Sequence, residues 1–120
     1  MTTRRIKSYT AETGLVWEYY FVGKRPAIGD RELSATEYVY DVSSDRQKTR
    51  FAVSVFVRQD GPETWAANQG RGLSDAEEYA AAKMRLLRGF DEVEDMLAHG
   101  RELQVDAGNI EELLEPLNLE

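Results

Sequence analysis

Apolar residues alternate with polar ones along much of the first half of the chain, and they recur every three or four positions in the second half. The alternation is clearest in Phe51, Val53, Val55 and Val57, which would share one face of a strand. Period-two patterns rich in β-branched and aromatic residues predict four strands. These are Leu15–Val22, Glu37–Ser43, Arg50–Gln59 and a short fourth strand over Glu63–Asn68.

Turn-forming residues separate these strands. Gly23–Ala35 contains Pro26, two glycines and mixed charges, which indicates a connecting loop. Ser43, Ser44 and Asp45 predict a hairpin turn between the second and third strands, and Asp60-Gly61-Pro62 predicts another turn after the third.

A long helix is predicted from Ser74, which is placed to act as the N-cap with Glu77 at the reciprocal position of a capping box. The helix is expected to reach His99 before Gly100, with Gly89 as a point where it could bend or divide. Its apolar stripe consists of Tyr79, Leu86, Phe90, Val93 and Leu97.

A second, short helix is predicted over Ile110–Glu115, with Asn109 as its cap and Pro116 ending it. The chain is therefore expected to be α+β, with an antiparallel three- to four-stranded sheet followed by a long helix packed on one face and a short C-terminal helix. Its length of 120 residues suits a single domain over residues 1–120.

The composition of the chain indicates the compartment in which the protein resides. There is no cysteine, which excludes disulfides and thiolate metal sites and fits a reducing compartment. No apolar run is long enough to span a membrane, so we expect a cytoplasmic protein without a membrane partner.

Charge and aromatic content are unevenly distributed. Ten of the twelve aromatic residues precede Gly70, and the first sixty residues carry a net charge of +2 against −9 for the last sixty. The total of −7 argues against loose binding to phosphate backbones, which needs clustered Lys and Arg.

Candidate catalytic chemistry is sparse. His99 is the single histidine, so no Ser-His-Asp or Cys-His arrangement has sequence support. The carboxylates Asp91, Glu92, Glu94 and Asp95 indicate a solvated helix face rather than a cation site. We therefore expect a non-enzymatic protein without a cofactor or a metal.

The aromatic residues are too many for one sheet face covered by one helix, so some are expected on an exposed face. This favours a protein–protein interaction or self-association module, with a homodimer expected in solution. The expected contact residues are Trp17, Tyr19, Tyr38, Tyr40 and Phe56 on the sheet, with Leu113, Leu114 and Leu117 in the tail.

The alternative is nucleic-acid binding through a basic hairpin loop aided by sheet aromatics. Its candidate residues are Arg46, Lys48 and Arg50 in the loop, with Arg25 and Arg31.

From Thr36 to Leu87 the sequence resembles the double-stranded-RNA-binding domain. Thr36-Glu37-Tyr38 precedes a polar loop, Phe51 to Val57 reads as the family's alternating strand, and Gly70-Arg71-Gly72-Leu73-Ser74 opens a helix that carries Ala80-Ala81-Ala82. The resemblance implies a β-β-β-α unit.

The RNA-binding positions of that family are missing. Asp75, Ala76 and Tyr79 stand where the family's lysine cluster would grip phosphates, and the loop Ser43–Lys48 has no Gly, Pro or His. A similar sheet-plus-helix outline occurs in HicB-type antitoxins, in which it caps a partner toxin, and this keeps a protein partner in view.

Overall fold

The computed structural model describes residues 5–28 and 34–117, which fold into one sheet and a layer of helices. Among these residues the elements follow in chain order. They are β1 (Lys7–Thr10), β2 (Val16–Ile28), β3 (Ser34–Ser43), β4 (Phe51–Arg58), α1 (Asp60–Gln69), α2 (Asp75–Glu92), α3 (Met96–His99), β5 (Glu102–Val105), α4 (Ile110–Leu114) and the 3-10 turn η2 (Glu115–Leu117).

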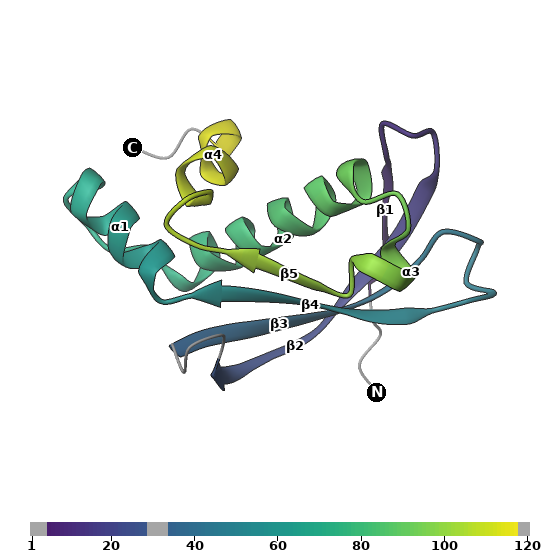
Figure 1. Ribbon diagram of the computed structural model, residues 1–120, viewed down its shortest axis with the longest axis horizontal. Coiled ribbons are helices and arrows are strands. Elements are labelled where there is room, and N and C mark those ends of the chain that lie inside the picture. The colour runs from purple at the N-terminus through teal and green to yellow at the C-terminus, as the bar shows by residue number, and fades with distance from the viewer. Residues whose placement is uncertain (1–4, 29–33, 118–120) are drawn as a thin grey trace.

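Within the described residues the sheet has five strands, in the order β1-β2-β3-β4-β5. The first four pair antiparallel, whereas β5 pairs parallel with β4, so the expected purely antiparallel sheet is wrong. Two consecutive strands that pair parallel need a long crossover connection between them. Helices α1, α2 and α3 form this connection between β4 and β5 (Figure 1). The α+β class is confirmed, and β1 and β5 are additional to the predicted strands.

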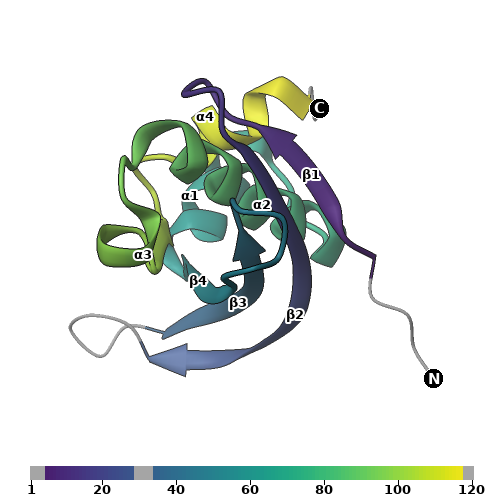
Figure 2. The same ribbon diagram turned by 90° about the vertical axis from the view of Figure 1, so that its right-hand side faces the viewer.

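Strand β2 is longer than predicted and continues from Val16 through Gly23 to Ile28. The loop prediction is therefore wrong for Gly23–Ile28, and also for Ser34 and Ala35, which belong to β3. A register shift between Phe21 and Gly23 leaves Val22 as the extra residue of a β-bulge. Figure 2 shows β2 continuing past the start of β1 and curving with β3.

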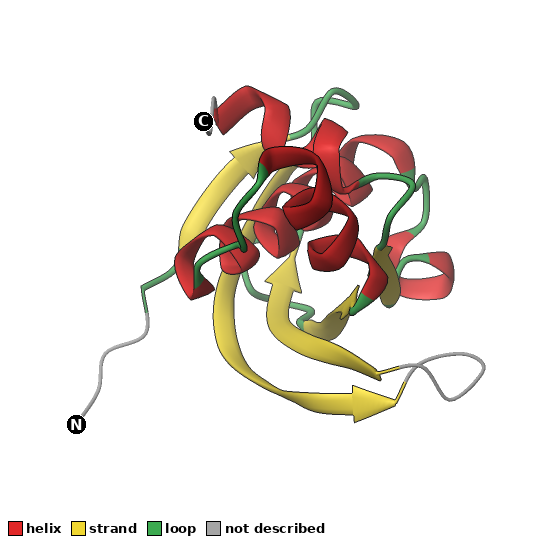
Figure 3. Cartoon of the chain, turned by 90° about the vertical axis from the view of Figure 1, so that its left-hand side faces the viewer, coloured by secondary structure: helices red, strands yellow, loops and turns green. Residues whose placement is uncertain are grey.

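The helices cover one face of the curved sheet (Figure 3). The predicted alternation in β4 is confirmed, because Val53, Val55 and Val57 are all buried on the face that meets α2. Trp17 of β2 stacks on Phe90 of α2 with ring centroids 4.6 Å apart. This apolar layer is the core of the domain.

Helix α2 begins as predicted. The Ser74 hydroxyl accepts from the Glu77 amide at 3.1 Å, and the Glu77 carboxylate accepts from the Ser74 amide at 2.9 Å. The helix ends at Glu92 rather than at His99, and α3 is a separate turn. Gly89 lies inside α2, where an added Cβ would stand 2.9 Å from Leu103 Cδ1, so the glycine lets β5 approach the helix.

The predicted fourth strand over Glu63–Asn68 is wrong, because these residues form α1. Asp60-Gly61-Pro62 starts this helix instead of making a turn. Pro62 lies in the first turn, where its missing N–H removes no helical hydrogen bond. Trp65 is buried beneath the helix and anchors it to the core.

The short C-terminal helix is confirmed over Ile110–Leu114. Asn109 does not cap it with its side chain. Its amide instead accepts from the Asp106 N–H and donates to the Gln104 carbonyl, which fixes the turn between β5 and α4. No helix in the described part of the chain combines the length and apolar character needed to cross a membrane.

Candidate functional site

Four of the five aromatic residues expected on a contact surface lie in the core. Trp17, Tyr19, Tyr38 and Tyr40 point to the helix-covered face of the sheet and are at most 5% exposed. Phe56 lies on the opposite face and is half-buried. The aromatic surplus is therefore used mainly for packing between the sheet and α2, and Phe56 is the member of the set that faces away from the helices.

The leucines expected in the tail are also divided. Leu113 and Leu114 are buried against the core, whereas Leu117 in η2 is 39% exposed. The tail leucines are therefore used mainly for packing against the core. Residues of the same tail line two adjoining hollows.

The first hollow lies between the β1–β2 turn, α2 and the α4–η2 segment, and has a volume of about 370 Å³. We call it the acidic groove. Its walls carry four carboxylates against one guanidinium, above an apolar floor. The charged residues are Glu12, Asp91, Glu92, Glu112 and Arg88, and the apolar ones include Met84, Leu87, Leu113 and Pro116.

Asp91 builds one wall of the acidic groove by joining three segments. Its carboxylate accepts a hydrogen bond from the Tyr9 hydroxyl at 2.7 Å and another from the Glu12 amide at 2.8 Å. The hydrogen bond to Asp91 raises the pKa of Tyr9 to about 12, with burial adding to the effect. The β1–β2 turn is thereby held against the end of α2.

Glu112 stands on α4, at the opposite wall. Its carboxylate lies 3.6 Å from the Arg88 guanidinium and is 69% exposed, so this ion pair is weak and leaves the carboxylate open to solvent.

A second hollow of about 550 Å³ adjoins the groove between α1 and α4. Glu112 lines both hollows, and Glu111 and Glu115 add further carboxylates to the second. Asn68 donates to the Glu111 carboxylate, which ties α1 to α4. Carboxylates from four separate segments therefore converge on one side of the helical layer.

The opposite side of the sheet carries a different pattern. Glu37 accepts from Arg25 at 2.7 Å and from the Ser54 hydroxyl at 2.6 Å, across three neighbouring strands. The Arg25 hydrogen bond and that of Ser54 lower the pKa of Glu37. Tyr20 similarly donates to Asp41 at 2.6 Å. Glu37 is thus paired with a cation, whereas Asp41 accepts from a neutral hydroxyl.

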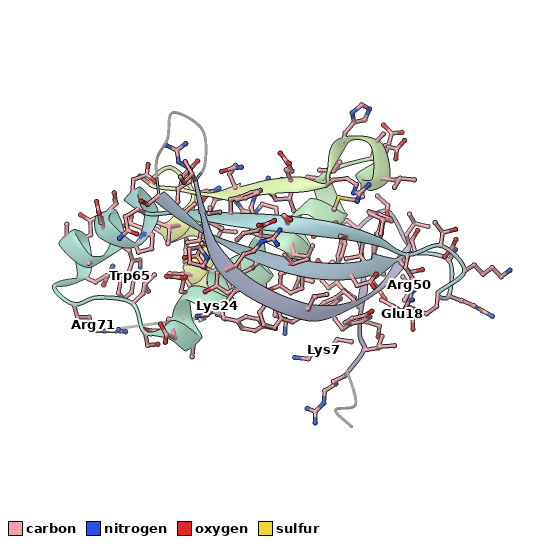
Figure 4. The ribbon with its side chains drawn as sticks, turned by 90° about the horizontal axis from the view of Figure 1, so that it is seen from below. Lys7, Glu18, Lys24, Arg50, Trp65 and Arg71 are labelled. Carbon is pink, nitrogen blue, oxygen red and sulfur yellow. The ribbon has the colours of Figure 1, made fainter. Side chains whose placement is uncertain are left out.

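The candidate nucleic-acid residues are spread over two places. Arg46, Lys48 and Arg50 are exposed near the β3–β4 turn, where Arg46 adopts a positive φ of 59°. Arg25 lies on β2 and is paired with Glu37. Arg31 lies outside the described residues. Figure 4 shows Arg50 at the end of the sheet farthest from Trp65 and Arg71.

Within residues 5–28 and 34–117, no three His, Asp or Glu side chains gather closely enough to hold a metal ion. His99 is exposed at the end of α3.

Sequence reasoning pointed to an acidic helix and a leucine-rich tail but missed the groove between them. The acidic runs were visible, yet the contribution of Glu12 depends on the β1–β2 turn, which no local pattern places next to α2. Comparisons with family models, with curated proteins and with solved structures found no match.

Proposed function

We propose that this chain is a non-enzymatic, cytoplasmic protein-interaction module that binds a basic segment of another protein in the acidic groove. The observation that carries the proposal is the convergence of carboxylates from the β1–β2 turn, α2 and α4 around an apolar floor. A hollow of about 370 Å³ suits one or two side chains of a partner.

Charge complementarity defines the partner. The groove carries three net negative charges in its lining, within a chain of net charge −7. Such a field speeds the approach of a cationic segment and repels an acidic one. The exposed apolar edge at Leu117, next to Pro116 of the lining, favours an apolar anchor residue among the partner's cations.

The expected affinity is modest. Exposed ion pairs contribute about 0.2–1 kcal/mol each, so three of them supply about 1–3 kcal/mol in addition to apolar burial. Binding should weaken as the salt concentration rises, since the charges are close to solvent.

The proposal is tested with a synthetic peptide of about fifteen residues that carries lysines and leucines at helical spacing, and with its glutamate counterpart. Binding is measured by fluorescence anisotropy at about 0.05 M and about 0.3 M salt. The groove variant combines Glu12→Gln, Glu92→Gln and Glu112→Gln. The matched control combines Glu63→Gln, Glu94→Gln and Glu102→Gln, which remove the same charge from exposed sites outside both hollows.

We expect the groove variant to bind the lysine peptide about tenfold more weakly, which corresponds to about 1.4 kcal/mol. The control variant should stay within about twofold of the native protein. Equal weakening in both variants would show that net charge alone attracts the peptide. Absence of binding at low salt would equally overturn the proposal.

Nucleic-acid binding is the second candidate, and the exposed cations Arg46, Lys48 and Arg50 near one turn favour it. Three cations can release few counterions, so the expected salt dependence is shallow. Affinity for duplex RNA and for single strands at low salt decides this alternative. Arg46→Gln, Lys48→Gln and Arg50→Gln together should abolish any affinity that this turn provides.

A further inference from the structure

Strand β2 is only partly covered at the edge of the sheet. β1 pairs with Val16–Tyr19, and from Phe21 to Ile28 β2 has β3 on one side and no described strand on the other. We call Phe21–Ile28 the open edge. Figure 2 shows this part of β2 continuing beyond β1. A strand edge without a neighbouring strand presents backbone N–H and C=O groups that can pair with another chain.

The open edge also exposes apolar side chains. Phe21 is 37% exposed, Val22 45% and Ile28 76%. Phe21 pairs with Tyr40 and Lys24 with Tyr38, so both point to the helix side of the sheet. There Phe21 meets Tyr79 of α2 edge-on, with ring centroids 5.1 Å apart. A strand added at this edge would find apolar surface beside it.

Lysines surround that aromatic cluster. The Lys24 ammonium lies 5.7 Å from the centre of the Tyr38 ring. Lys83 follows Tyr79 by one helical turn, and Lys7 pairs with Tyr19 at the end of β1. The ammonium groups of Lys7 and Lys83 lie close together. Burial, together with the positive charge of Lys7, lowers the pKa of Lys83. Figure 4 shows Lys7 and Lys24 on the same side of the molecule.

Two carboxylates also lie on this side, near the Tyr38 hydroxyl. Glu78 accepts a hydrogen bond from the Tyr38 hydroxyl at 2.7 Å, and Asp75 lies near the same hydroxyl. Lys7, Lys24 and Lys83 therefore exceed these two carboxylates by one positive charge. An acidic ligand would meet attraction at Lys7, Lys24 and Lys83 together.

We propose that the open edge of β2 binds an extended, acidic segment of a partner protein by strand addition. Backbone hydrogen bonds would provide the pairing, while alternate side chains of the added strand reach the lysine-lined aromatic side. Carboxylates at those alternate positions would pair with the lysines. The site is separate from the acidic groove and takes a ligand of the opposite charge.

A second copy of this chain is a poor occupant of the same edge. Pairing two β2 strands would bring Lys24 and Arg25 of each copy close to those of the other, and like charges across a strand pair destabilise it. Pro26 lacks the N–H that a ladder requires at its position. An acidic strand can still pair with this edge. Lys24 and Arg25 attract its carboxylates, and Pro26 removes only one backbone donor.

The test uses a synthetic peptide of about ten residues in which valine alternates with glutamate, and a second peptide in which lysine replaces glutamate. A third peptide keeps the glutamates but carries N-methyl groups on alternate backbone nitrogens, which removes the donors along one edge. Binding is followed by anisotropy, and amide hydrogen exchange measured by NMR locates the contact.

The expected result is binding of the valine–glutamate peptide with slowed exchange confined to Phe21–Ile28 and its neighbours. The lysine peptide and the N-methylated peptide should each bind about tenfold more weakly. Lys24→Glu should weaken binding about fivefold, whereas Lys48→Glu, the same charge change near the β3–β4 turn, should leave it within about twofold.

Several outcomes overturn the proposal. Full binding of the N-methylated peptide would mean that charge alone holds the ligand. Protection located away from β2, or absence of binding at about 1 mM peptide, would do the same. The triple groove variant should bind this peptide as the native chain does, so failure here is distinguishable from failure at the acidic groove.

Discussion

Removal of the Asp91 carboxylate should detach the β1–β2 turn from α2 and open one wall of the acidic groove. Asp91 accepts two hydrogen bonds from residues about eighty positions earlier in the chain, the Tyr9 hydroxyl and the Glu12 amide. Asp91→Ala removes both bonds. Asp91→Asn keeps one amide oxygen and can accept only one of them well.

The magnitude follows from these two contacts. A partly buried hydrogen bond to a charged acceptor contributes about 1.5 kcal/mol, and the more exposed bond from the Glu12 amide about 1 kcal/mol. A carboxylate in the last turn of α2 interacts unfavourably with the helix dipole. Its removal therefore stabilises the protein by about 0.5 kcal/mol. The net loss expected for Asp91→Ala is about 2 kcal/mol, with about half of that for Asp91→Asn.

Thermal unfolding followed by circular dichroism measures this loss. An unfolding entropy of about 2.1 cal/mol/K per residue gives about 0.25 kcal/mol/K for this chain, so Tm should fall by about 8 °C for Asp91→Ala. Glu94→Ala, an exposed carboxylate just beyond the end of α2, is the control and should shift Tm by less than about 2 °C.

A double-mutant cycle shows whether the Tyr9 contact accounts for the effect. Tyr9→Phe alone should cost about 1.5 kcal/mol, and it should add almost nothing in the Asp91→Ala background. Full additivity of the two changes, or a Tm for Asp91→Ala within about 2 °C of the native value, would refute the assignment of Asp91 as the residue that holds the turn.

Three further changes test other parts of the fold. Ser74→Ala should lower stability by about 1 kcal/mol in a urea titration, because it removes the N-cap of α2, and Ser74→Asp should restore most of it. Gly89→Ala adds about 1 kcal/mol of helix propensity but forces the Leu103 side chain to move, so a net loss of about 1 kcal/mol is expected at the urea midpoint. For Glu37, whose pKa is lowered by Arg25, the stabilisation is complete above the ordinary value of 4.5 and is lost as pH falls through the lowered pKa. The stability difference between native protein and Glu37→Gln should therefore narrow as pH decreases from about 6 to about 3, and a constant difference would contradict this reasoning.

Local patterns predicted the parts of the fold that depend on local chemistry. The capping box needs only Ser74 and Glu77, and the strand β4 needs only its own alternation of valines. Strand β5 was missed because it has four residues and owes its existence to parallel pairing, with Val55 opposite Leu103. Such pairing joins segments that are far apart in sequence, so no window of sequence contains the signal.

The burial of the aromatic residues could not be predicted for a related reason. Trp17 and Tyr20 lie on opposite faces of β2 and are both largely buried. Trp17 stacks on Phe90 of α2, whereas the Tyr20 hydroxyl donates to Asp41 on the other face. Which face receives a helix is decided by the crossover that brings α2 back over the sheet. The sequence pattern of β2 is compatible with either choice, because apolar residues occupy both faces.

The acidic groove and the open edge place opposite charges on separate parts of one small domain. The distribution does not simply follow the two halves of the sequence, since Glu12 belongs to the first half but lines the groove, and Lys83 belongs to the second but lies beside the edge. Folding therefore brings together charged residues that are far apart in the sequence. Each surface should respond to a peptide of one sign, and reversal at Lys24 or neutralisation at Glu112 should affect only its own surface. We therefore expect the domain to bind two partners at once, one in the acidic groove and one along the open edge. Simultaneous binding of the lysine–leucine peptide and the valine–glutamate peptide to one protein would test this expectation directly.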